Sequence, residues 1–116
     1  MLLKIAATII LLHGLIHLFG VITFWKIGLH EHYSTKVLGG AMDIGEKGVY
    51  VLGFVWLVAT IAFTIAAYGM FTDQDWWQTG LFAAATYSLV LTVLAWKDAI
   101  FGTLINLSIL VALLLT

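Results

Sequence analysis

The sequence contains no cysteine, no proline and no arginine, and it has few charges of either sign. Without cysteine, disulfides, thiolate metal sites and thiol chemistry are excluded. Without proline, no helix kink can be assigned to that residue, which argues against a transporter built on proline-broken helices. The chain has no arginine to form a bidentate fork with phosphates, and its net charge is −1. We therefore expect no nucleic-acid partner.

The scarcity of charge also determines the solvent of the chain. Charged residues make up 9% of the sequence, against roughly 25% in an ordinary soluble domain. Hydrophobic residues make up 63% of it. So little polar surface cannot cover a water-soluble globule. We therefore predict a multi-pass protein of the cell (inner) membrane, with the lipid bilayer as its partner.

Four apolar runs follow one another, at residues 2–25, 49–71, 76–96 and 99–115. Each has about 17 to 25 residues, the length of a membrane-spanning helix. A secretory signal peptide is the competing interpretation of the first run, but its length, its two histidines and the lack of an A-x-A site favour a retained span. The turns at 72–75 and 97–98 are short, so helices two to four are antiparallel neighbours. The prediction is a single all-α domain over residues 1–116, an integral membrane four-helix bundle with antiparallel transmembrane helices.

The one long connection, residues 26–48, predicts the orientation. Its second half, residues 34–48, is expected to be a short interfacial helix or an early start of helix two. Four of the five lysines fall on the face that carries this loop, and only Lys4 falls on the other. The positive-inside rule then places the loop in the cytoplasm and both termini outside.

Two histidines, His13 and His17, lie within the first apolar run, four residues apart. In a helix that spacing puts both imidazoles on one face. Ionisable residues inside a membrane are rare and usually face the bundle interior. The functional interpretation is a metal-ligand pair, a proton relay or a cofactor site. The structural one is two neutral imidazoles hydrogen-bonded to neighbouring helices.

The fourth run supplies partners for these histidines. Asn106 and His17 each lie eight residues from the same membrane face, a depth of about 12 Å. This predicts a His17–Asn106 contact, with Gly20 and Gly102 close enough to let the two backbones approach. Asp98 opens the same helix, either as a proton or cation acceptor or as a carboxylate that stabilises the helix dipole, and the second role is favoured. The predicted buried polar network consists of His13, His17, Asn106 and Asp98.

No metal or cofactor site is complete in the sequence. His30 and His32 flank Glu31 and could hold Zn²⁺ or Cu²⁺ weakly, but a structural zinc site needs four ligands, and a solvated loop is the commoner outcome. His13 and His17 share one helix, so a monomer cannot place them on opposite sides of a haem, whereas a homodimer could. No Ser-His-Asp set, phosphate loop or buried carboxylate pair occurs. We predict no cofactor and no enzymatic activity.

A stripe of small residues in the second run predicts an oligomer. Its members, spaced as on one helix face, are Ala59, Ala62, Ala66 and Gly69. Small side chains let membrane helices approach closely. The stripe is therefore interpreted as the face of a homodimer.

Two segments resemble a group of small bacterial four-span membrane proteins. They are HGLIHLFG at residues 13–20 and WKDAIFGTLINL at 96–107, which match an HGLIHL-type first helix and a W-x-D-A-x-F-G-T-x-x-N fourth helix. Between them, VLGFVWLVA at 51–59 and a tryptophan pair before helix three also fit. The resemblance implies the four-span fold and carries over no activity, because transporter labels on such proteins rest on span count.

Three functional hypotheses result. The leading one is a non-enzymatic accessory or scaffold bundle. The second is a small homodimeric transporter that uses buried His13 and His17, although four-span exporters of similar size rely on a glutamate in helix one that this chain lacks. The third is a metal- or haem-binding membrane redox protein that uses the same two histidines.

Overall fold

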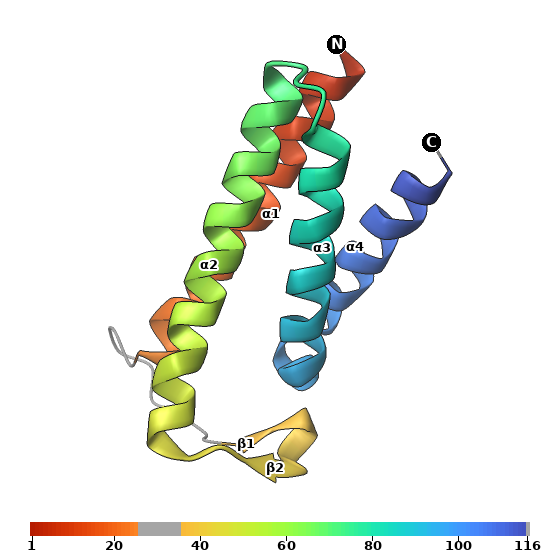
Figure 1. Ribbon diagram of the computed structural model, residues 1–116. Coiled ribbons are helices and arrows are strands. Elements are labelled where there is room, and N and C mark those ends of the chain that lie inside the picture. Colours follow the sequence, from red (N-terminus) through yellow and green to blue (C-terminus); the bar gives the residue numbers. More distant parts are fainter. Residues whose placement is uncertain (26–35, 116) are drawn as a thin grey trace.

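The computed structural model describes residues 1–25 and 36–115, with the backbone alone at 23, 24, 36, 39 and 96–98. Four helices account for most of these residues: α1 (Leu2–Phe24), α2 (Gly45–Phe71), α3 (Trp77–Leu94) and α4 (Trp96–Leu114). Figure 1 shows both termini and the α2–α3 turn at one end of the bundle, and the α3–α4 turn at the other. The predicted all-α four-helix fold is confirmed.

Three of the helices are long and apolar enough to cross a membrane. Their candidate spans are Leu2–Ile22, Gly45–Phe71 and Trp77–Leu94. In α4 the apolar segment is shorter, Ala99–Leu114. Its 16 residues rise about 24 Å, somewhat less than the hydrocarbon core of roughly 30 Å.

The connection before α2 contains a small hairpin that the sequence analysis did not predict. It consists of β1 (Lys36–Val37), the 3₁₀ turn η1 (Leu38–Gly40) and β2 (Met42–Asp43), with Val37 paired to Met42. The chain reverses because Leu38 and Gly40 both adopt positive φ, at 56° and 96°. Val37 is buried and attaches the hairpin to the bundle. An interfacial helix is therefore not formed here, whereas the early start of helix two, at Gly45, is confirmed.

The junction between α3 and α4 also differs from the prediction. The turn was expected at residues 97–98, but Ala95 alone separates the two helices. The chain breaks again at Ala99, whose φ of −125° and ψ of 29° are not helical. The fourth helix consequently begins at Trp96, three residues earlier than predicted.

In the bundle, α1 packs chiefly on α2 and α4 chiefly on α3, while α3 packs on α2 nearly as extensively as on α4. A Cβ atom added to Gly14 would lie 2.6 Å from the Cβ of Phe63, and one added to Gly20 would lie 2.5 Å from a ring carbon of Trp56. A Cβ atom added to Gly102 would instead lie 3.1 Å from Cγ2 of Thr92 on α3. The predicted approach of Gly20 to Gly102 is therefore wrong, because Gly20 packs against α2 and Gly102 packs against α3.

The small-residue stripe of α2 lies inside the bundle. Ala59 and Ala66 have no exposed surface, Gly69 is buried, and Ala62 is partly buried against the core. Ala66 belongs to a core cluster that includes Ala7 of α1 and Ala85 of α3. The stripe therefore cannot form the predicted dimer face, and a homodimer would have to use another surface. Sequence alone did not separate the two cases, since small residues favour close packing within a chain as well as between chains.

Candidate functional site

The two histidines of α1 face the interior of the bundle, as predicted. His13 is 5% exposed and His17 is 2% exposed. The Nε2 atom of His13 lies 2.9 Å from Oδ1 of Asn106 on α4. The Nε2 atom of His17 lies 2.5 Å from Oγ of Ser88 on α3. The predicted His17–Asn106 contact is therefore wrong by one helical turn: His13 binds Asn106, and His17 binds Ser88.

The depths of these residues agree with these partners. Counted from the end of α1 at Trp25, His17 lies about 12 Å deep and His13 about 18 Å deep, and counted from Ala95, Ser88 lies about 10 Å into α3. Ser88 is therefore the polar residue at the level of His17. Asn106 lies beyond the break at Ala99, and its contact with His13 places it deeper than His17.

The hydrogen bonds of these four side chains close into a ring. The Nδ1 atom of His17 lies 2.9 Å from the carbonyl oxygen of His13. A carbonyl can only accept, so this Nδ1 carries the hydrogen, and in a neutral imidazole Nε2 is then an acceptor. Ser88 must donate its hydroxyl hydrogen to that Nε2. We call His13, His17, Ser88 and Asn106 the polar ring.

The remaining two bonds follow from the direction of the first two. Because the Ser88 hydrogen is in use, its Oγ accepts from Nδ2 of Asn106, at 2.9 Å. The Oδ1 atom of Asn106 then accepts from Nε2–H of His13, at 2.9 Å. Nδ2 of Asn106 also lies 3.4 Å from Oγ1 of Thr92, which donates to the carbonyl of Leu89. Every N–H and O–H of the polar ring thus has an acceptor within the chain.

The second helix closes the site with aromatic rings. Phe63 packs edge-on against His13, with centroids 5.0 Å apart, and its centroid is 5.2 Å from that of His17. Trp56, also on α2, has its ring centroid 5.3 Å from that of His17. Ser88 and Asn106 have no exposed surface at all. The polar ring therefore joins α1, α3 and α4, while α2 covers it with apolar surface.

The arrangement is not that of a metal centre. Among the residues that the structure describes, no group of three or more His, Cys, Asp or Glu side chains could hold a metal ion. The Nε2 atom of each imidazole is directed at Asn106 or Ser88, so ligation there would displace a ring partner. His30 and His32 lie outside the described residues, and so does the side chain of Asp98. Three of the four predicted network residues are thus found in the ring.

Ser88, in the polar ring, and Thr92, beside it, were not among the predicted network residues. A serine in a helix commonly bonds the backbone of its own helix, so its presence alone does not predict a contact with another helix. The sequence did contain a sign that Ser88 points into the bundle. It lies at helical spacing on the same face of α3 as the buried residues Leu81, Ala84 and Ala85. Matching depths across all four helices, and not only helices one and four, would have identified it.

Comparison with known proteins adds no relative. No family model matches the chain, and neither a curated protein nor a solved structure matches it. The resemblance of its first and fourth helices to small bacterial four-span proteins therefore stays a prediction from sequence motifs.

Proposed function

We propose that the protein is a non-enzymatic, multi-pass protein of the cell (inner) membrane that acts as an accessory or scaffold bundle. The observation that supports this is the closure of the polar ring. Its donors are all satisfied by groups of the same chain, so none is directed at a ligand. Polar side chains used in this way join membrane helices and stabilise their packing.

The direction of the bonds argues against a proton relay. A relay transfers a proton and then reverses the direction of its hydrogen bonds to reset. In the polar ring, the carbonyl oxygen of His13 receives the bond from His17 Nδ1 and has no hydrogen to return. The ring therefore has a single direction, which suits a structural connection of α1 to α3 and α4.

Purified protein distinguishes this function from the metal, haem and transport hypotheses. We expect no haem absorption and no stoichiometric metal. We expect His17→Ala to lower the free energy of unfolding by about 1–3 kcal/mol, because two bonds of roughly 0.6–1.7 kcal/mol each are lost. The measurements are an absorption spectrum, metal analysis and reversible unfolding in mixed micelles. A metal, chromophore or proton-coupled uptake signal that disappears in His17→Ala while unfolding is unchanged would contradict the proposal.

The proposed orientation places the hairpin end of the bundle in the cytoplasm and both termini outside. Met42, on the hairpin, is 51% exposed, and Gln74 is exposed in the α2–α3 turn at the end that carries the termini. In intact cells, we expect a membrane-impermeant thiol reagent to label Gln74→Cys and not Met42→Cys. The chain has no cysteine of its own, so the unmodified protein is the background control. Labelling of Met42→Cys and not of Gln74→Cys would show that the orientation is the opposite one.

A further inference from the structure

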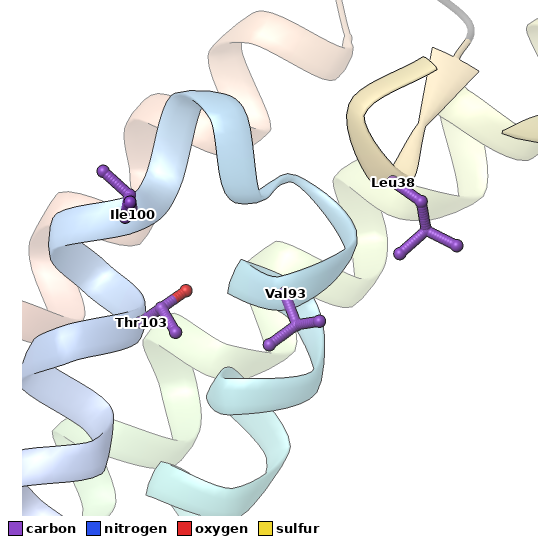
Figure 2. A pocket seen from close by; sticks show the side chains of 4 residues that line it. All are labelled: Leu38, Val93, Ile100 and Thr103. Carbon is purple, nitrogen blue, oxygen red and sulfur yellow. The ribbon is translucent and has the colours of Figure 1, made fainter. Parts of the chain in front are cut away.

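We draw no further inference here: the strongest candidate, the pocket where the hairpin meets the ends of α3 and α4, which is lined by Leu38, Val93, Ile100 and Thr103 (Figure 2), adjoins side chains at 96–98 that lie outside the described residues, and nothing in the structure shows what covers it.

Discussion

Replacing Asn106 with leucine is expected to lower the free energy of unfolding by about 2–4 kcal/mol, the largest effect of any single polar substitution in the bundle. Leucine has a similar shape, so packing changes little. The variant loses the contacts of Asn106 with His13, Ser88 and Thr92. It also leaves the Nε2–H of His13 without an acceptor in an apolar interior, which adds a desolvation cost. Reversible unfolding in mixed micelles measures the difference.

Ser108→Ala is the matched control on the same helix. Ser108 is exposed, and its hydroxyl bonds only the carbonyl of Leu104 in its own helix. We expect this variant to change stability by less than about 0.5 kcal/mol, as is usual for surface substitutions. An equal loss in the Ser108 and Asn106 variants would show that the polar ring contributes nothing specific.

A double-mutant cycle tests which histidine Asn106 contacts. His13 shares a hydrogen bond with Asn106, whereas His17 is connected to it through Ser88. The coupling energy of Asn106→Leu with His13→Ala should therefore exceed its coupling with His17→Ala. A larger coupling with His17 would mean that Asn106 contacts His17, as the sequence predicted, and would contradict the polar ring.

The inward direction of His13 and His17 could be predicted from sequence because it depends on one local cost. An imidazole has two ring nitrogens, and an imidazole that faced hydrocarbon would leave at least one of them without a polar partner, a cost that facing the other helices avoids. The choice of partner depends on how deep each residue lies relative to residues of the other helices. Depth is counted from the predicted ends of the helices, so an error in a helix boundary becomes an error in depth. The turn between α3 and α4 was predicted at 97–98, whereas the chain departs from helix at Ala95 and Ala99, so a depth counted from the predicted turn assigned Asn106 to His17 and not to His13.

The hairpin and the α2 stripe show a different limit. The reversal at Leu38 needs a leucine in a conformation that its own side chain disfavours, so local propensity argues against it. Burial of Val37 against the bundle and the adjacent Gly40 make the turn favourable only in the folded context. The stripe of Ala59 and Ala66 was recognised correctly as a packing surface. Its partner could not be assigned, because periodicity specifies a face and not what covers it.

Replacing Gly14 with alanine is expected to destabilise the bundle by about 1–3 kcal/mol, as overpacking of a close contact usually does. The new Cβ would lie 2.6 Å from Cβ of Phe63 and 3.6 Å from the carbonyl oxygen of Thr60. Phe63 is fully buried, and its Cβ is fixed to the backbone of α2, so the two helices must move apart. Gly14 adjoins His13, and the displacement of α1 should also weaken the polar ring.

Gly80→Ala separates this steric effect from the intrinsic preference of a helix for alanine, which is worth about 1 kcal/mol in the opposite direction. At Gly80 the nearest atom is the ring edge of Trp76, 3.3 Å from the added Cβ, and that ring is 41% exposed and can shift. We expect Gly80→Ala to keep or slightly raise the free energy of unfolding while Gly14→Ala lowers it, with both measured in the same micelles. Changes of the same sign and size in the two variants would mean that α1 does not approach α2 as closely as Gly14 and Phe63 require.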